Sequence, residues 1–141
     1  CIWRLSIMAN GTIAFDTLST SGQITGTAKS VDTDYVVNGS AKAWWTLNGT
    51  GTIAPRDSFN VSSFDDVTTG TYDANYTNTM ADGNYSFQGT TGIASNTAYV
   101  FAYHTSTAPS TTDIRFGCET SNNATLQDQS YVYGTINGDV A

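Results

Sequence analysis

Few residues in this sequence combine the side-chain types and spacing that catalysis requires. His104 is the only histidine, so any serine or cysteine nucleophile that depends on a histidine base would have to use it. It directly follows the aromatic run Tyr99–Tyr103 and belongs to no recognisable catalytic motif, so we interpret it as a packed or rim histidine. Twelve Asp and Glu residues could supply paired carboxylates for glycoside cleavage, yet nothing picks out two of them. The sequence therefore predicts no catalytic residue and no enzymatic activity.

Metal and cofactor sites are equally poorly indicated. One histidine and two distant cysteines, Cys1 and Cys118, do not make a typical zinc site. The two closest acidic clusters, at residues 32–34 and 65–66, lack the spacing and the distal Glu of a calcium-binding loop. The glycines fall in turns and show no phosphate-binding pattern after a strand. We expect neither a metal ion nor a cofactor.

The composition sets limits on the fold and on the partners. The 141 residues (15.0 kDa) fit one domain, and only 12% are charged, against about 25% in ordinary globular proteins. Polar Thr, Ser, Asn and Gly replace the long charged side chains that favour helices, which indicates strands. The net charge of −7 argues against nucleic-acid binding, which needs clustered Lys and Arg. No apolar run approaches the roughly 20 residues of a membrane helix, so we expect no membrane insertion.

The stretch at residues 41–63, AKAWWTLNGTGTIAPRDSFNVSS, predicts the centre of an antiparallel sheet. Every second residue from Ala41 to Leu47 is apolar, so one face of this strand is built to be buried. The Asn-Gly dipeptide at 48–49 predicts a tight hairpin turn, because both residues accept positive φ angles. Phe59 and Val61 then alternate with polar residues as a returning strand.

Later segments repeat this alternation and predict further half-buried strands, closed by a strand at residues 131–136. Cys118 lies on the apolar side of its segment, which predicts a buried free thiol. The spacing of about eight to ten short strands is typical of an antiparallel β-sandwich or jelly roll, which we place at residues 41–141. The alternating apolar residues are Tyr72, Ala74 and Tyr76, then Tyr85 and Phe87, then Ile114, Phe116 and Cys118.

One segment, residues 98–104, is apolar on both faces and must be covered on both sides. The cover could be a second sheet and a loop of the same subunit, or another subunit. Trp44 precedes Trp45 in the same strand, so the two side chains point to opposite faces and Trp44 is predicted to face outward. It could be an oligomer contact or an ordinary surface aromatic. We take these residues as a candidate oligomer interface: Trp44, Tyr99, Phe101 and Tyr103.

The first 40 residues are predicted to form an extended N-terminal arm. Residues 9–40 are rich in Thr, Ser, Gly and Asp, with too few apolar residues to build a core alone. They could be a linker, or an arm that adds a strand to a neighbouring protein. Met8-Ala9-Asn10 resembles a translation start, which makes residues 1–7 an upstream extension or an artefact, although a mature bacterial lipoprotein would also begin with Cys. The candidate docking residues of the arm are Ile13, Phe15, Leu18 and Ile24.

The 41–63 stretch, together with TMADGNYSF at residues 79–87, resembles a module of phage virion proteins, especially tail-fibre and appendage proteins of marine and freshwater phages. The similarity covers about a third of the chain and departs from the family pattern at Trp45-Thr46 and Pro55. It implies a non-enzymatic, β-rich, homotrimeric virion component whose arm docks on other virion proteins and whose sandwich faces the host, with a host-surface glycan as a candidate partner. A capsid decoration (cement) protein or a head-fibre protein is a variant of this reading.

A second hypothesis comes from a different class of protein. The chain could be a secreted or lipid-anchored carbohydrate-binding module that acts as a monomer. In that case exposed aromatic side chains such as Trp44, Tyr99 or Tyr103 would stack on sugar rings. The solution mass of the chain separates this hypothesis from a trimeric virion component.

Overall fold

A computed structural model describes residues 23–25, 30–92, 99–103, 107–120 and 125–141. The side chains of residues 23–34 and 99–103 lie outside this description. The chain divides into two units, Cys1–Thr33 and Asp34–Ala141, which we describe separately. In the first unit, β1 (Gln23–Thr25) pairs antiparallel with β2 (Ser30–Asp32).

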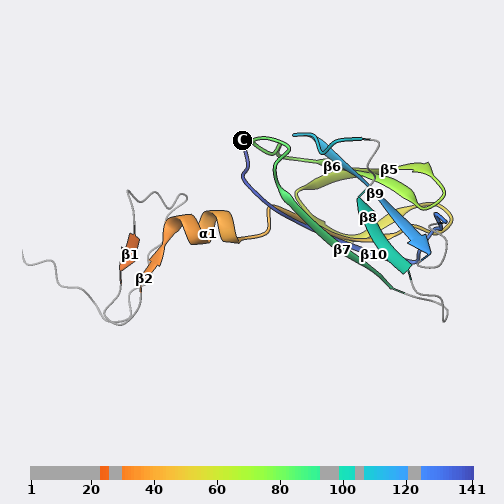
Figure 1. The fold of residues 1–141 in the computed structure, drawn as a ribbon, viewed down its shortest axis with the longest axis horizontal. Coiled ribbons are helices and arrows are strands. Elements are labelled where there is room, and N and C mark those ends of the chain that lie inside the picture. The colour runs from red at the N-terminus through yellow and green to blue at the C-terminus, as the bar shows by residue number, and fades with distance from the viewer. Residues whose placement is uncertain (1–22, 26–29, 93–98, 104–106, 121–124) are drawn as a thin grey trace, which may run out of the picture. The chain divides into compact units, whose positions relative to one another are not determined.

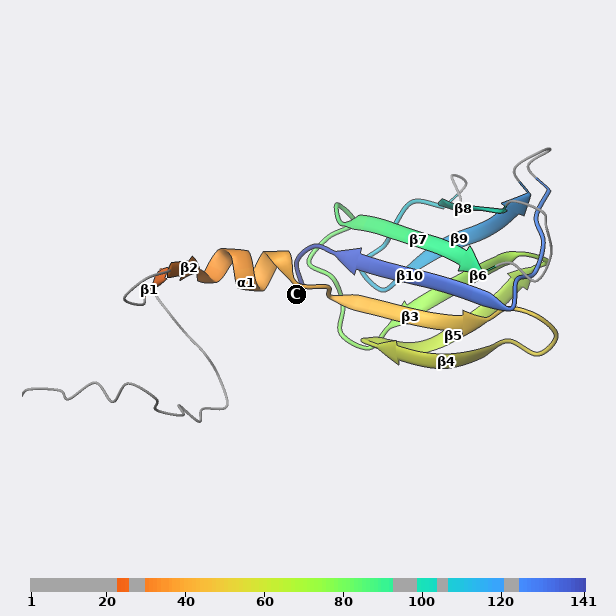
Figure 2. The same cartoon turned by 90° about the horizontal axis from the view of Figure 1, so that it is seen from below.

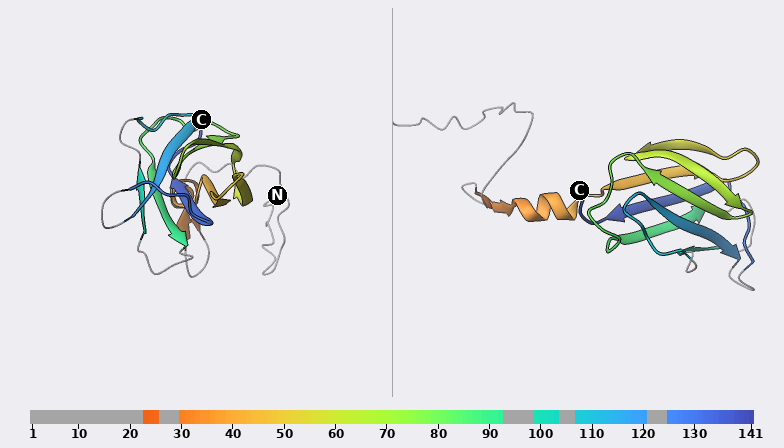
Figure 3. Two further views of the ribbon diagram at one scale, coloured as in Figure 1. Left: turned by 90° about the vertical axis from the view of Figure 1, so that its right-hand side faces the viewer. Right: turned by 90° about the horizontal axis from the view of Figure 1, so that it is seen from above.

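The second unit contains two four-stranded antiparallel sheets that face each other (Figure 1; Figure 2). Figure 3 shows the same two layers from the end and from above. The strand order is β4-β3-β10-β7 in the first sheet and β5-β6-β9-β8 in the second. The predicted all-β sandwich is therefore confirmed. The strands are β3 (Ala43–Asn48), β4 (Ala54–Phe59), β5 (Val61–Thr68), β6 (Thr71–Tyr76), β7 (Ser86–Gly92), β8 (Tyr99–Tyr103), β9 (Asp113–Thr120) and β10 (Tyr131–Asn137).

The core fills the space between the two sheets and is centred on Trp45 of β3. The Trp45 ring lies 5.2 Å from the ring of Phe116 and 5.8 Å from that of Phe87, measured between centroids. The alternation predicted for β3, β6 and β9 is confirmed, since the apolar residues at every second position of each strand are buried. The buried apolar residues are Ala43, Trp45, Leu47, Tyr72, Ala74, Tyr76, Met80, Ile114, Phe116, Cys118, Val132 and Ile136.

At Asn60 the chain leaves the first sheet and enters the second. Asn60 has a left-handed φ of 56°, and its side chain holds the corner through three hydrogen bonds. Its amide donates to the carbonyls of Lys42 (2.9 Å) and Asn78 (3.1 Å), and its Oδ1 accepts from the Asn78 N–H (2.7 Å). The single strand predicted through Phe59 and Val61 is therefore wrong. Because the backbone turns between them, Phe59 faces outward and is 54% exposed.

The turn after β3 also differs from the predicted tight hairpin. Five residues, 49–53, separate β3 from β4, and the left-handed position in this loop is Gly51, with φ of 66°. Gly49 is needed for a different reason. Its N–H donates to the Gln129 carbonyl (2.8 Å), and a Cβ at this position would lie 2.7 Å from Cζ of Tyr72. The Asn-Gly pair therefore allows a close contact between loops and does not form the turn itself.

The prediction of an extended arm over residues 1–40 is wrong at one segment, because Thr33–Gly39 forms a helix, α1. The C-terminal end of α1 is capped from downstream, because the Lys42 ammonium and the Ser40 hydroxyl both donate to the Val37 carbonyl. A pattern of apolar residues does not reveal such a cap. Of the predicted docking residues, Ile24 lies in β1, where only the backbone is described. Ile13, Phe15 and Leu18 lie outside the described residues.

Candidate functional site

The outer face of the β4-β3-β10-β7 sheet carries large aromatic side chains. Trp44 is 37% exposed, Tyr131 43% and Tyr133 38%, and Phe59 lies on the same face. Strand alternation places Trp44, Tyr131 and Tyr133, because the neighbouring positions in β3 and β10 are buried in the core. Phe59 shares this face because it pairs with Trp44. Exposed aromatic side chains that gather on one face mark a surface for contact with another molecule.

The strand register brings these side chains together from three neighbouring strands. Trp44 of β3 pairs with Phe59 of β4 on one side and with Thr135 of β10 on the other. Tyr133, two residues before Thr135, pairs with Thr46 of β3. Paired residues on one face have their Cβ atoms about 5 Å apart, so Trp44 and Phe59 are direct neighbours, whereas Tyr133 lies diagonally from Trp44, about 7 to 8 Å away. We call Trp44, Phe59, Tyr131 and Tyr133 the aromatic face.

The Tyr131 end of the aromatic face is held in a fixed arrangement. The rings of Tyr131 and Tyr133 are nearly parallel, at 14°, with centroids 6.3 Å apart. The Arg56 guanidinium lies 4.3 Å from the Tyr131 centroid and donates to the Ser130 carbonyl (3.0 Å). A guanidinium over an aromatic ring is an attractive cation–π contact. The positive charge of Arg56 is thereby fixed beside Tyr131, away from Trp44.

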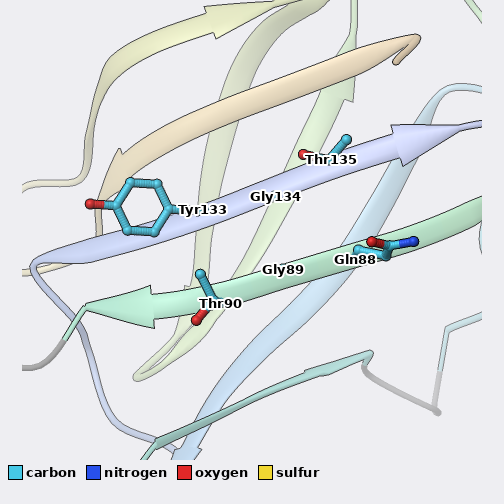
Figure 4. Close-up of a pocket in the computed structure, with 6 residues that line it drawn as sticks. All are labelled: Gln88, Gly89, Thr90, Tyr133, Gly134 and Thr135. Atoms are coloured by element: carbon cyan, nitrogen blue, oxygen red, sulfur yellow. The ribbon is translucent and has the colours of Figure 1, made fainter. Parts of the chain in front are cut away.

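A groove of about 280 Å³ lies over β7 and β10, beside the aromatic face (Figure 4). Figure 4 shows the Tyr133 ring face-on, lying along the sheet, with Thr135 further along β10. Gln88 and Thr90 of β7 border the other side. Glycine residues of the two strands lie between these four side chains, so backbone forms the floor. All the lining residues are uncharged.

A second hollow, of about 330 Å³, lies where the Asn60 corner meets the start of β3. Three of the polar side chains that line it, those of Ser40, Lys42 and Asn60, already have structural partners. Lys42 donates to Val37 and to Ser40 Oγ (2.9 Å), and Asn60 holds the corner described above. We interpret this hollow as part of the scaffold.

Several charged groups on the outer face of the other sheet have partners within the protein. Arg115 of β9 makes a two-pronged contact with Asp73 of β6, with both N–O distances 2.7 Å. Asp65, from the acidic cluster at residues 65–66, accepts from Asn75 (2.8 Å). Among the described residues, no group of three His, Cys, Asp or Glu side chains is arranged to hold a metal ion. This face therefore offers less for recognition than the aromatic face does.

Three buried acidic groups are kept in their neutral forms. Burial raises the pKa of Tyr72, and the neighbouring Asp128 carboxylate raises it further. Burial is the largest cause that raises the pKa of Tyr76, and the hydrogen bond to Tyr85 raises it further. Burial also raises the pKa of the Cys118 thiol from its ordinary value of 9.0 to about 12. Deprotonation of any of the three would leave an anion in the core.

We therefore predict that the sandwich loses stability at alkaline pH. The three groups ionise in the unfolded chain above about pH 9 to 10 but stay neutral in the folded chain, so folding is fully favoured below that range and weakens as pH rises. Each group should cost about 1.4 kcal/mol per pH unit above its ordinary pKa. Urea unfolding at pH 7, 9, 10 and 11 measures this loss, and Tyr72→Phe should reduce the slope. Equal stability at pH 7 and 11 would contradict the assignment.

The structure places the predicted site residues as follows. Trp44 is exposed, as predicted. In β8, the register pairs Phe101 with Cys118 and Tyr103 with Phe116, while the side chains of β8 lie outside the description. Their part in an interface, together with that of Tyr99, stays a prediction. His104 also lies outside the described residues, whereas Cys118 is buried and free, as predicted.

The sequence interpretation missed three members of the aromatic face. Tyr131 and Tyr133 alternate with Val132 and Gly134, and this alternation was sufficient to place both tyrosines outward. Phe59 could not be placed in this way, because its direction depends on the corner at Asn60. The groove also depends on pairing between β7 and β10, which are more than 35 residues apart in the sequence.

No protein-family model matches the chain, and no curated protein or solved structure matches it either. Within the part of the chain that the structure describes, no helix has the length and apolar character needed to cross a membrane.

Proposed function

We propose that the chain is a non-enzymatic structural subunit of a bacteriophage virion, a homotrimeric tail-fibre or appendage protein. The observation that carries this proposal is the aromatic face. Trp44 and Phe59 are both exposed there and are neighbours on the paired strands β3 and β4. In the trimer, this part of the face packs against the neighbouring subunits.

The segment that resembles phage virion proteins also builds this surface. Residues 41–63 form β3, β4 and the start of β5, and they contain Trp44 and Phe59. Trp44 and Phe59 are 37% and 54% exposed in the single subunit, and covering this remaining apolar surface favours association. Symmetric copies of one chain can cover each other's faces in a closed ring. The number of three subunits comes from the resemblance.

The N-terminal region has a separate role in this proposal. Residues 9–40 dock the subunit on other virion proteins, with Ile13, Phe15, Leu18 and Ile24 as the apolar anchors. The sandwich is then presented on the outside of the particle, where it contributes to host attachment. A capsid decoration (cement) protein or a head-fibre protein would use the same architecture and differ in where the arm docks.

The solution mass of the 141-residue chain tests this proposal. We expect light scattering at two concentrations, without reductant, to give a stable species near three times the subunit mass of 15.0 kDa. A species of one subunit mass at both concentrations would contradict the trimer.

A carbohydrate-binding module, secreted or lipid-anchored and monomeric, is the second candidate function. The groove beside Tyr133 favours it, because an aromatic ring there lies flat next to uncharged polar side chains. A monomeric mass together with sugar binding would support this candidate over the virion subunit.

A further inference from the structure

We infer that the groove over β7 and β10 binds a neutral saccharide, one sugar ring of a longer glycan. The site consists of Tyr133, Thr135, Gln88 and Thr90, which we call the groove residues. Neither the resemblance nor the sequence interpretation points to these positions. The ligand class follows from the groove itself, and only its source, a host-surface glycan, rests on the proposed function.

The register arranges the groove residues as the four corners of a frame. Tyr133 pairs with Thr90, and Thr135 pairs with Gln88. Side chains two residues apart on a strand are separated by about 7 Å, and paired strands by about 5 Å. Between the corners, Gly134 pairs with Gly89, and a side chain at Gly134 would point to the inner face, toward Trp45, so backbone alone lies between the four outward side chains. The volume of about 280 Å³ is just below the usual range of ligand sites, about 300 to 1,000 Å³, so the groove would contact one sugar ring of a longer chain.

The Tyr133 ring provides an apolar platform at one end of the frame. Figure 4 shows this ring face-on, and the Tyr133 side chain is 38% exposed. The ring is nearly parallel to that of Tyr131, its neighbour on the same strand, which limits its freedom to rotate. Sugar rings present C–H groups on their faces, and such groups pack favourably on an aromatic face that needs no reordering.

The other corners supply hydrogen-bonding groups that are free to bind. Within the described residues, the side chains of Gln88, Thr90 and Thr135 make no hydrogen bond to the protein. The Gln88 amide can both donate and accept, and so can each threonine hydroxyl. Sugar hydroxyls also do both, so the chemistry of the frame is complementary to a polyol.

The absence of charged side chains in the frame favours a neutral ligand over an anionic polymer. All six lining residues are neutral, and the net charge of −7 opposes anionic polymers. A proline-rich peptide would need a row of aromatic ridges along its length. The groove instead offers one flat ring bordered by polar groups, which favours a saccharide over a peptide.

Binding of neutral hexasaccharides to the full chain tests this inference. We would titrate the protein with glucose-, mannose-, galactose- and N-acetylglucosamine-based hexamers, with polygalacturonate as the anionic comparison and a proline decamer as the peptide comparison. We expect at least one neutral hexamer to saturate the protein at millimolar concentration or below. Tyr133→Ala should weaken this binding about tenfold and Gln88→Ala about threefold to tenfold.

Val67→Ala is the matched control, because Val67 is an exposed apolar residue on β5 of the other sheet. It should leave binding unchanged, and the melting curves of all three variants should show that they fold. The inference is overturned if no neutral hexamer saturates, if binding survives both groove substitutions, or if polygalacturonate or the proline decamer binds more tightly. These outcomes are independent of the solution mass, so the saccharide site and the trimer can fail separately.

Discussion

Gly134→Ala is expected to lower the free energy of unfolding by about 3 kcal/mol, because the added methyl group would overlap the Trp45 ring. A Cβ at Gly134 would lie 2.8 Å from the Cη2 atom of Trp45 and closer still to two other ring atoms. Trp45 is buried between Phe116 and Phe87 and has no space into which it can move. Urea unfolding followed by tryptophan fluorescence measures the loss.

Gly39→Ala is the control for this substitution, since a Cβ at Gly39 has no atom within 4 Å and Gly39 has no left-handed φ. It should change stability by less than about 0.5 kcal/mol. If the two variants were equally stable, the packing of Trp45 against β10 would be wrong.

Trp44→Asp is expected to dissociate the proposed trimer into folded monomers. The substitution removes a large aromatic side chain from the interface and places a charge there, and tryptophan contacts at the centre of an interface contribute about 2 to 4 kcal/mol. Because Trp44 lies outside the core and is 37% exposed in the single subunit, the monomer should lose some stability but stay folded. Light scattering reports the mass, and circular dichroism reports the fold.

Val67→Asp provides the comparison for Trp44→Asp. Val67 has a similar exposure, 36%, but lies on β5 of the opposite sheet. The proposal requires it to keep the mass of three subunits. Equal effects of the two substitutions would mean that the trimer does not depend on the aromatic face.

Much of the sandwich could be predicted because the sequence of each strand alone shows which of its residues are buried. In β6 and β9, apolar residues at every second position are buried as the pattern indicates, and the same holds for β3. This signal needs no knowledge of which strands pair, since each strand shows the same period of two whatever its neighbour is.

The predictions failed where a residue's role depends on a distant partner. The left-handed conformation of Asn60 is held by Lys42 and Asn78, each 18 residues away, and it reverses the direction of Phe59. The end of α1 depends on Lys42. The groove exists only because β10 pairs with β7, so a sequence pattern could reveal Tyr133 but not the frame around it.

The central claim, that the Trp44 and Phe59 part of the aromatic face is the assembly surface, is tested most directly by hydroxyl-radical footprinting of the full chain read out by mass spectrometry. Oxidation rates would be compared between a concentrated sample and one diluted until light scattering reports a single subunit. The account predicts that Trp44 and Phe59 oxidise several-fold more slowly in the concentrated sample, while Val67 and the exposed Tyr35 keep their rates. Unchanged rates at Trp44 and Phe59 in a sample with the mass of three subunits would contradict it.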